Sequence, residues 1–282
     1  MQKDRTETHL EREFPMSNQN FQKIKAVAYE ITGINLTDQK KNMIYSRLAR
    51  RIRACGLSSF DEYCQLLETP GNQEMTDFVN AITTNLTSFF RENHHFDYLS
   101  NTVFPELLSK NNISKRIRVW SAGCSTGEEP YSIAMCMREK LPAESWDVKL
   151  LATDLDSNVV QHGKTGIYAP DRLDGISAER KKRWFLKGHD SGGARAKPDL
   201  QKLITFKQLN LLHDWPMKGP FDVIFCRNVV IYFDRETQQR LFNRYAELLA
   251  PGGYLFIGHS ENLHKVSDRF KSVGRTIYQR IK

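Results

Sequence analysis

From residue 117 onwards, short apolar segments alternate with amphipathic helical segments, and this alternation restricts the fold more than any other feature of the chain. Helical patterns cover residues 130–141 and 236–249, and a Pro-Gly-Gly helix stop follows the second. The apolar segments with the length of strands are 117–122, 148–153, 203–209, 221–226 and 254–258. Such alternation predicts an α/β fold, in which a doubly wound, mostly parallel sheet carries helices on both faces.

One interval in this part of the chain is too long for a simple connection between strands. Between Gly166 and Leu203, the sequence RWFLKGHDSGGARAKPDLQ contains a short apolar segment, a Gly-rich turn and a return. We therefore expect a small inserted β-subdomain with a hairpin at about residues 167–203. The final segment, FKSVGRTIYQRIK, is typical of an antiparallel pair of strands.

Residues 17–90 have a helical period instead, which predicts an N-terminal helical domain. One expected helix runs from about Asp38, placed as its N-cap, towards Gly56, placed as its stop. The apolar stripe of this helix consists of Ile44, Leu48 and Ile52.

The remaining segments complete the expected domain organisation. Residues 91–116 are expected to form a helix and a connector, and residues 117–282 the sheet domain with its insertion. Residues 1–16 are expected to be a flexible tail, because their first fourteen positions are rich in charged residues and lack the apolar core of a signal peptide.

Composition limits the compartment and the partners. The five cysteines are odd in number and form no C-x-x-C pair, which argues against a disulfide framework and a zinc site and favours the cytoplasm. The longest apolar runs are much shorter than the roughly 20 residues that span a bilayer. A net charge of +8 favours an acidic partner without saying whether it is protein or nucleic acid.

The segment RVWSAGCSTGEEPYSIA places a turn of small residues between the first strand and a helix. Small residues let a ligand approach the backbone at the carboxyl end of a strand. The glycines do not match G-x-G-x-x-G, and Glu128 and Glu129 stand where a phosphate would meet the helix, so a phosphate ligand is disfavoured. These carboxylates suit a cationic ligand such as S-adenosylmethionine, although they also complement the helix dipole.

Polar residues follow the other strands of the predicted sheet. Asp154 ends the second strand, where a carboxylate can accept both ribose hydroxyls of an adenosine ligand. The alternative is that Asp154 or Asp156 caps the following helix. After the third strand, Asn210 is placed to contact the adenine edge and Leu211 to pack on the ring. After the fourth, Arg227 and Asn228 interrupt the apolar sequence FDVIFCRNVVIYF, where a reacting centre is expected.

Four segments in order carry a family resemblance: NAITTNLTSFFRE, VWSAGCSTGEEPYSIA, FDVIFCRNVVIYF and GHSENL. Together they resemble the CheR family of chemotaxis receptor methyltransferases, over roughly residues 20–280. The resemblance implies a class I, Rossmann-like S-adenosylmethionine-dependent methyltransferase fold. It also implies an enzyme, a protein-glutamate O-methyltransferase, that converts receptor glutamates to methyl esters and leaves S-adenosylhomocysteine as its product.

The resemblance also assigns functional residues. It implies that Arg91 and Tyr232 lie near the transferred methyl group and orient the substrate carboxylate. For Arg91 the alternative is a salt bridge, and for Tyr232 it is ordinary core packing. The cofactor contacts that it implies are Asn85, Thr87, Arg91, Glu129, Asp154, Asn210, Leu211, Arg227 and Asn228.

The family resemblance supplies an acidic partner for the basic helix near residue 50. Its arginines lie at spacings that separate them from the apolar stripe, so we expect them to dock the helical bundle of a receptor. A merely solvated basic face, or RNA binding, is the alternative. The predicted docking residues are Arg47, Arg50, Arg51 and Arg53. The resemblance also implies that the loop Gly188 to Gly193 lies where some family members hold a receptor C-terminal peptide, and a monomer is expected.

Two other functions remain open at this point. A nucleic-acid methyltransferase is suggested by the basic composition, but the Asp/Asn-Pro-Pro-aromatic motif of amino-directed enzymes is absent after the fourth strand. Cys226 stands close to the position of a pyrimidine-C5 nucleophile, but no proline precedes it, which favours a small buried residue. The other possibility is a non-catalytic adaptor that uses the fold only to bind partners.

Overall fold

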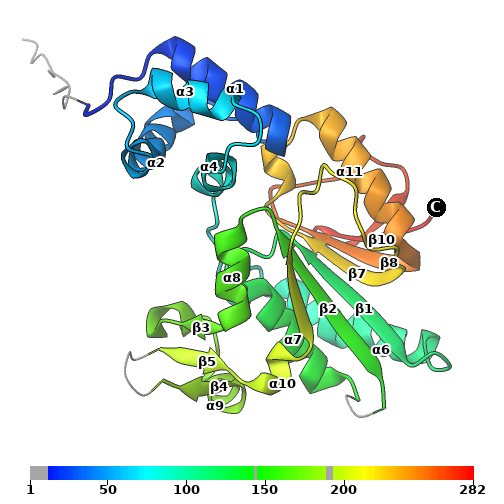
Figure 1. Ribbon diagram of the computed structural model, residues 1–282. Helices are drawn as coiled ribbons and strands as arrows, with labels where there is room; N and C mark the ends of the chain where they lie inside the picture. Colours follow the sequence, from blue (N-terminus) through cyan, green and yellow to red (C-terminus); the bar gives the residue numbers. More distant parts are fainter. Residues whose placement is uncertain (1–11, 143–144, 189–192) are drawn as a thin grey trace, which may run out of the picture. The chain divides into compact units, whose positions relative to one another are not determined.

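The computed structural model describes residues 12–142, 145–188 and 193–282, and the chain divides into two compact units (Figure 1). Met1–Thr83 is here called the helical unit and Thr84–Lys282 the sheet unit. This boundary precedes the expected one at residue 90, because Phe89 and Phe90 are buried in the core of the sheet unit.

Four α-helices form the described part of the helical unit: α1 (Asn18–Thr32), α2 (Lys41–Ala54), α3 (Phe60–Glu68) and α4 (Glu74–Ile82). The predicted stripe of α2 is buried, with Ile44, Leu48 and Ile52 fully covered. Asp38 is not its N-cap, which corrects the expectation. Asp38 opens a 3-10 turn, η1 (Asp38–Lys40), ahead of the α-helix.

The expected flexible tail also differs at its end nearest to α1. Phe14 is buried, and its backbone N–H donates to the Tyr45 hydroxyl at 3.4 Å. Arg12 donates to the side chain of Asn42. Residues 12–16 are therefore anchored on α2, while residues 1–11 lie outside the described residues.

The sheet unit is built on a seven-stranded sheet with the order β6-β2-β1-β7-β8-β10-β9. The first five strands in this order are parallel, and β10 and β9 add an antiparallel pair at one edge, as predicted for the end of the chain. The strands are β1 (Arg116–Ala122), β2 (Asp147–Asp154), β6 (Ile204–Gln208), β7 (Phe221–Cys226), β8 (Leu249–Ile257), β9 (Phe270–Gly274) and β10 (Ile277–Arg280). Because the sheet is doubly wound, both of its faces are covered.

Successive residues of β7 belong to different cores, which explains why this strand is a continuous apolar run. Val223 and Phe225 lie in one core, while Ile224 and Cys226 lie in the other. The first core includes residues of η2 (Leu99–Val103), α6 (Phe104–Lys110) and α7 (Glu128–Lys140), and the second includes residues of α11 (Arg235–Leu248).

Residues 91–116, expected to be partly a connector, instead form an integral layer of the sheet unit. Besides η2, which is a π-helix, and α6, the short helix α5 (His94–Tyr98) lies here. Leu99, Val103 and Leu107 are fully covered or nearly so in the first core. The segment therefore belongs with the sheet rather than between two domains.

The strand after α11 begins earlier than predicted. The helix ends at Leu248, and β8 starts at Leu249, so Pro251 to Gly253 lie within the strand. The pairing of β7 with β8 shifts between Phe221 and Val223, which accommodates the extra residues. The predicted end of the helix at Leu249 is therefore confirmed to within one residue, whereas the predicted strand start at Tyr254 is wrong, because Pro251 to Gly253 already belong to an irregular strand.

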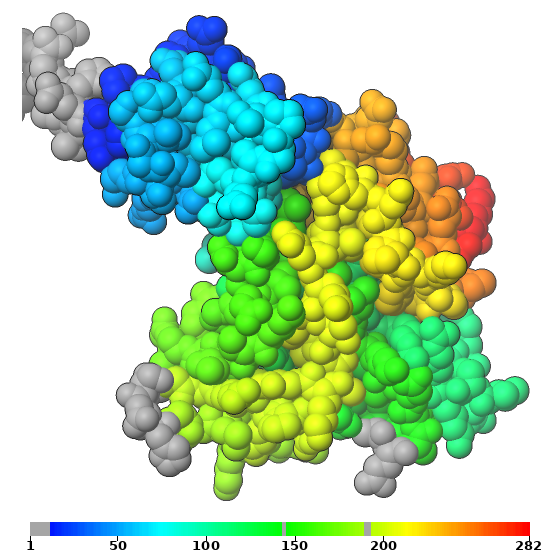
Figure 2. Space-filling model, in the orientation of Figure 1, coloured from blue at the N-terminus to red at the C-terminus, as the bar shows by residue number. Residues whose placement is uncertain are grey.

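An inserted subdomain follows α8 (Ser157–Thr165) and forms a separate three-stranded antiparallel sheet of order β3-β5-β4. It contains β3 (Ile167–Tyr168), η3 (Pro170–Leu173), α9 (Ala178–Trp184), β4 (Phe185–Lys187), β5 (Ala194–Ala196) and α10 (Pro198–Gln201). The predicted hairpin is the β4–β5 pair. In Figure 2, the yellow residues around 205–220, which include β6, form a strip across one face of the sheet unit.

Among the described residues, no helix has both the length and the apolar character that crossing a membrane requires.

Candidate functional site

The centre of the sheet contains a topological switch point. From β1 the chain proceeds to β2 and β6 on one side, and β7 and β8 lie on the other side. In open α/β sheets, the carboxyl ends of the strands at such a point form the crevice where ligands bind. The residues after β1, β2 and β7 therefore form the candidate ligand site.

The turn after β1 requires glycine at two positions. Gly123 and Gly127 both have φ of +101°, a conformation that other residues rarely adopt. A Cβ atom on Gly127 would lie 2.6 Å from the Tyr168 hydroxyl, which itself donates to the Thr126 carbonyl at 2.9 Å. With no side chain at these two glycines, a ligand can approach the backbone of the turn. Tyr168, from the inserted subdomain, holds the turn in place.

Glu129 and Arg227 form a buried ion pair between α7 and the end of β7. Arg227 Nη1 lies 2.9 Å from Glu129 Oε2, and the Ser121 hydroxyl donates to the other carboxylate oxygen at 2.8 Å. Burial raises the pKa of Glu129 and outweighs the opposite effect of Arg227. The pair joins two of the predicted cofactor residues.

Arg227 also reaches the segment before α5. Its Nη2 donates to the backbone carbonyl of Arg91, and it lies 3.5 Å from Glu92 Oε2. Its Nε is buried without a hydrogen-bond partner among the described residues. Arg227 therefore holds the backbone of one predicted catalytic residue, and it retains one unused donor.

Glu128 has a different environment from its neighbour. Its fully buried carboxylate accepts from the Thr126 hydroxyl at 2.6 Å and pairs with Arg172. Arg172 also donates to the Thr87 carbonyl at 3.0 Å. The Glu128 carboxylate thus already has partners within the protein. Arg172, which no local sequence signal identifies, links the inserted subdomain to the turn after β1.

Asp154 lies at the end of β2 and is half-buried. Its carboxylate accepts from the backbone N–H groups of Ser125 at 2.8 Å and Asp156 at 3.0 Å. Asp156, not Asp154, caps the next helix, because its side chain accepts from the backbone N–H groups that begin α8. Burial raises the pKa of Asp154 from 3.8 to about 6.

The segment before α5 contributes the predicted residues Asn85, Thr87 and Arg91. The Asn85 side chain donates to Asp156 Oδ2 at 2.7 Å, and its carbonyl accepts from the Ser125 hydroxyl at 2.9 Å. Thr87 and Arg91 are half-buried, and Arg91 Nη1 donates to the Leu86 carbonyl at 2.9 Å. The segment is therefore bonded to both the β1 and the β2 turns.

Asn210 and Leu211 follow β6 at the same edge of the sheet. Leu211 is buried in the second core, and its carbonyl accepts from Arg244 at 2.8 Å. Asn210 is half-buried, and its side-chain oxygen accepts from the Leu212 N–H at 2.9 Å.

The loop after β7 is organised by Glu261, which the sequence argument did not single out. Asn228 has a positive φ of 58° and donates its backbone N–H to Glu261 Oε2 at 3.0 Å. Gly258 and Ile231 donate to the same carboxylate at 2.6 and 3.3 Å. The half-buried Tyr232 ends the 3-10 turn η4 (Val230–Tyr232) that this carboxylate supports. The only sequence signal for Glu261 was its place in GHSENL.

Cys226 has no exposed surface, and burial raises the pKa of its thiol well above the usual value. A nucleophilic cysteine needs a partially exposed thiolate. The environment of Cys226 therefore disfavours the pyrimidine-C5 reaction and agrees with a small buried residue.

The predicted docking residues on α2 differ in their contacts. Arg51 pairs with Glu74 at 2.6 Å and Asp77 at 2.7 Å, and Arg47 donates to the carbonyls at the end of α4. Arg50 and Arg53 are exposed, and Arg53 lies 3.3 Å from Glu13. Arg47 and Arg51 thus have structural contacts that the sequence argument did not anticipate.

Comparisons with known proteins give matches over both units. Residues 19–83 match the family model of the CheR methyltransferase all-alpha domain, and residues 85–279 match that of the CheR methyltransferase SAM-binding domain. Chemotaxis protein methyltransferase 2 of Pseudomonas aeruginosa is 45% identical over 272 residues, 94% of each chain. The chemotaxis protein methyltransferase of Escherichia coli is 42% identical, with 93% of this chain and 91% of that protein covered.

The chemistry of the side chains at the switch point fits S-adenosylmethionine. The carboxylate of Asp154 can accept from ribose hydroxyls, and the glycine turn allows close approach of the ligand. Carboxylates at the start of α7 repel phosphate but tolerate a cationic group. The buried, unpartnered Nε of Arg227 is a donor that a ligand carboxylate can satisfy.

Proposed function

Because this chain belongs to the CheR methyltransferase family, whose binding domain takes S-adenosylmethionine, we propose that it methylates glutamate side chains on the cytoplasmic part of chemotaxis receptors. The product on the receptor is a glutamate methyl ester. The observation that carries the proposal is the hydrogen-bonded network that joins Glu129, Arg227 and the Arg91 backbone at the end of β7. It links residues that the family resemblance assigns to the cofactor and to the substrate.

Cofactor binding is assigned to residues on both sides of the switch point. Asp154 accepts the ribose hydroxyls, and Asn210 and Leu211 contact the adenine. Glu129 and Arg227 bind the amino-acid end, where their opposite charges match an ammonium and a carboxylate. The backbone N–H groups that hold Asp154 support this assignment, because they fix its carboxylate before a ligand arrives.

The transfer needs no general base. When bound, S-adenosylmethionine supplies a methyl group on a positively charged sulfur. A glutamate carboxylate is already ionised at pH 7 and can attack without losing a proton. The task of the protein is therefore to align the carboxylate with the methyl group and to exclude water.

Arg91 and Tyr232 are assigned to this alignment. A guanidinium can hold a carboxylate by two parallel hydrogen bonds, and a phenol can donate a third. Two features support rigid positions for these side chains. Arg227 binds the Arg91 carbonyl, and Glu261 binds the loop that leads to Tyr232. Asn85 and Thr87 continue the same segment towards the cofactor.

The proposal is tested with methyl-labelled S-adenosylmethionine, a receptor cytoplasmic fragment and, in parallel, RNA. We expect label in the receptor fragment only, and release of that label as methanol in mild base, because methyl esters hydrolyse there and N-methyl groups do not. Base-stable label, or label in RNA, would contradict the proposal. Cofactor binding without any transfer would favour the adaptor function.

Receptor docking is proposed to use the exposed arginines of α2. Arg50 and Arg53 present positive charge to a helical bundle that carries several substrate glutamates, and their exposure supports this use. Arg47 contributes to the same positive field while it donates to backbone carbonyls. The charge of Arg51 is balanced by Glu74 and Asp77 within the unit.

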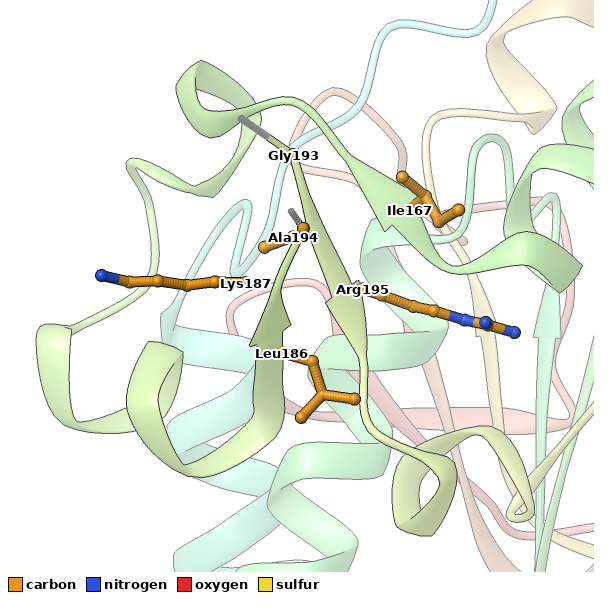
Figure 3. A pocket seen from close by; sticks show the side chains of 7 residues that line it. Ile167, Leu186, Lys187, Gly193, Ala194 and Arg195 are labelled. Carbon is orange, nitrogen blue, oxygen red and sulfur yellow. The ribbon is translucent and has the colours of Figure 1, made fainter. Parts of the chain in front are cut away.

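The inserted subdomain is proposed to hold the C-terminal peptide of those receptors that have one. Its three-stranded sheet has a pocket lined by Ile167, Leu186, Lys187, Gly188, Gly193, Ala194 and Arg195. Figure 3 shows the Lys187 and Arg195 side chains extending in opposite directions from neighbouring strands. The predicted tethering loop lies outside the described residues, except for its ends at Gly188 and Gly193. Methylation of a receptor with and without its tail tests this part, and equal rates would contradict it.

A further inference from the structure

Glu92, His94 and His95 bring a carboxylate and two imidazole rings together around the start of α5. One ligand atom of each residue lies within 4.8 Å of the others. His95 is fully buried, whereas Glu92 and His94 are half-buried. His259 extends the cluster, because its Nδ1 lies 3.3 Å from Glu92 Oε1. None of these side chains has been assigned to the cofactor or to the transfer.

The turn between β9 and β10 determines which ring nitrogens remain available. His94 Nε2 lies 3.3 Å from the Arg275 carbonyl oxygen and donates to it, because a carbonyl only accepts. His95 Nε2 lies 2.9 Å from the Thr276 hydroxyl, which donates its own hydrogen to the Arg275 carbonyl at 2.8 Å. In the tautomer in which His95 Nε2 donates to the Thr276 hydroxyl, both rings keep their lone pair on Nδ1.

In that tautomer, two of these electron-pair donors face each other without a hydrogen between them. His95 Nδ1 and Glu92 Oε2 are 3.6 Å apart, and both are buried without a hydrogen-bond partner among the described residues. Buried polar atoms are normally satisfied, and two acceptors cannot satisfy each other. A cation between them removes the conflict. Two ligands of a tetrahedral zinc ion, each about 2.1 Å from the metal, lie about 3.4 Å apart, close to the observed separation.

We propose that Glu92, His94 and His95 form a binding site for a divalent transition-metal ion, with Zn²⁺ as the preferred species. Glu92 Oε2 and the two Nδ1 atoms supply three ligands, and water supplies the fourth. Imidazole with carboxylate selects zinc, cobalt or nickel over magnesium and calcium. The Arg275 carbonyl and Thr276 hydroxyl orient the rings, as outer partners of metal-bound histidines do. The cysteine spacing has no bearing on such a site.

Metal binding has a structural consequence inside the sheet unit. Glu92 Oε2 also lies 3.5 Å from Arg227 Nη2, so an ion at Oε2 competes with that weaker contact. Arg227 keeps Glu129 and the Arg91 carbonyl as partners. The ion would tie residues 92–95 to the turn between β9 and β10 and stabilise the folded chain by mass action.

Titration of the full chain with Co²⁺, followed by visible absorption, tests the site directly. We expect one equivalent to give the intense ligand-field bands of tetrahedral cobalt without a sulfur-to-cobalt charge-transfer band. Absence of that band excludes the half-buried thiol of Cys55 as a ligand. A spectrum that stays at the weak six-coordinate form of Co²⁺ in buffer would overturn the proposal.

Variants locate the binding. His94→Ala is expected to weaken Zn²⁺ binding at least tenfold in competition with a chromophoric chelator, and Thr276→Val to weaken it about tenfold. His264→Ala removes an exposed histidine outside the cluster and is expected to leave binding unchanged. At the same Zn²⁺ concentration, the metal should also raise the melting temperature of the parent protein and of His264→Ala more than that of His94→Ala. Parent affinity in a folded His94→Ala would refute the assignment.

Discussion

Arginine is used in two different ways in the two units of this protein. In the sheet unit, Arg227 is 6% exposed and binds two carboxylates and a backbone carbonyl. In the helical unit, Arg50 is exposed, and the Arg53 side chain is 56% exposed with one long contact to Glu13. The same charged group is therefore desolvated in one unit and left in water in the other.

The difference in burial assigns two tasks to arginine: the buried Arg227 holds other residues in position, and the exposed arginines attract an acidic partner. A buried arginine is strongly coupled to its partners, since removing it leaves uncompensated buried carboxylates. An exposed arginine is screened beyond about 8 Å at physiological ionic strength and adds little to stability. Its field nevertheless raises the rate at which an acidic partner is met. Stability, turnover and association rate are thus expected to respond to different arginines.

The largest effect is expected from Arg227→Met. It leaves Glu129 and Glu92 without their guanidinium and should lower the free energy of unfolding by about 3–5 kcal/mol. Urea denaturation measures this loss. The matched variant Arg50→Met should change stability by less than about 0.5 kcal/mol.

A double variant checks the cause. If burial of an unpaired Glu129 explains the loss, Arg227→Met with Glu129→Gln should be more stable than Arg227→Met alone. If Arg227→Met lowers the free energy of unfolding by less than about 1 kcal/mol, as little as Arg50→Met does, the proposed difference between buried and exposed arginines is wrong.

The second prediction concerns the residues that Arg227 and Glu261 hold in place. Arg91→Ala and Tyr232→Phe should each lower kcat by up to about 100-fold, because a misaligned carboxylate reacts slowly. Their affinity for S-adenosylhomocysteine should change less than kcat, since their assigned task is substrate alignment. Radiolabel transfer at saturating cofactor, with calorimetry for the product, separates the two quantities. Normal turnover in either variant would end its catalytic assignment.

The third prediction uses the raised pKa of Asp154. A carboxylate accepts both ribose hydroxyls, whereas the protonated acid has lost part of that capacity. Because burial raises the pKa of Asp154 to about 6, affinity for S-adenosylhomocysteine should be constant above pH 7 and fall about tenfold by pH 5. Calorimetry across this range measures the effect.

The matched control for Asp154 is Asp154→Asn, which keeps the shape and cannot ionise. It should bind at least tenfold more weakly at pH 7 and lose the pH dependence. The same slope in this variant would assign the titration to another group. The pH dependence of cofactor binding in the sheet unit is thus assigned to the carboxylate of Asp154.

The parts of the fold that sequence predicted are those set by local patterns. The strand 221–226 was located at its observed bounds, because a buried parallel strand is a continuous apolar run. The start of β8 was not, because the pattern placed the strand after the Pro-Gly-Gly turn, at Tyr254, whereas pairing with β7 extends it back to Leu249. Tertiary pairing overrode the local signal there.

At the candidate site, the sequence predicted which residues stand at the strand ends, but not the residues with which they form hydrogen bonds and ion pairs. Glu129 and Asp154 were chosen because the carboxyl ends of parallel strands meet at one edge. That Arg172 neutralises Glu128, or that Glu261 collects three backbone N–H groups, depends on contacts between distant segments. The expectation that Arg51 is free to bind a receptor failed in the same way, because its partners Glu74 and Asp77 lie on another helix, α4.

The smallest effect is expected from the exposed arginines themselves. Arg50→Glu combined with Arg53→Glu should lower kcat/KM for a receptor fragment about threefold at low salt, and this difference should vanish as salt rises. Affinity for S-adenosylhomocysteine and the melting temperature should stay unchanged, because neither residue holds a buried partner. Lys202→Glu with Lys271→Glu makes the same change in net charge on the surface of the sheet unit and serves as the control. If the control lowers kcat/KM equally, net charge explains the effect and α2 is not a docking surface. If neither pair changes it, the basic face of α2 is only solvated.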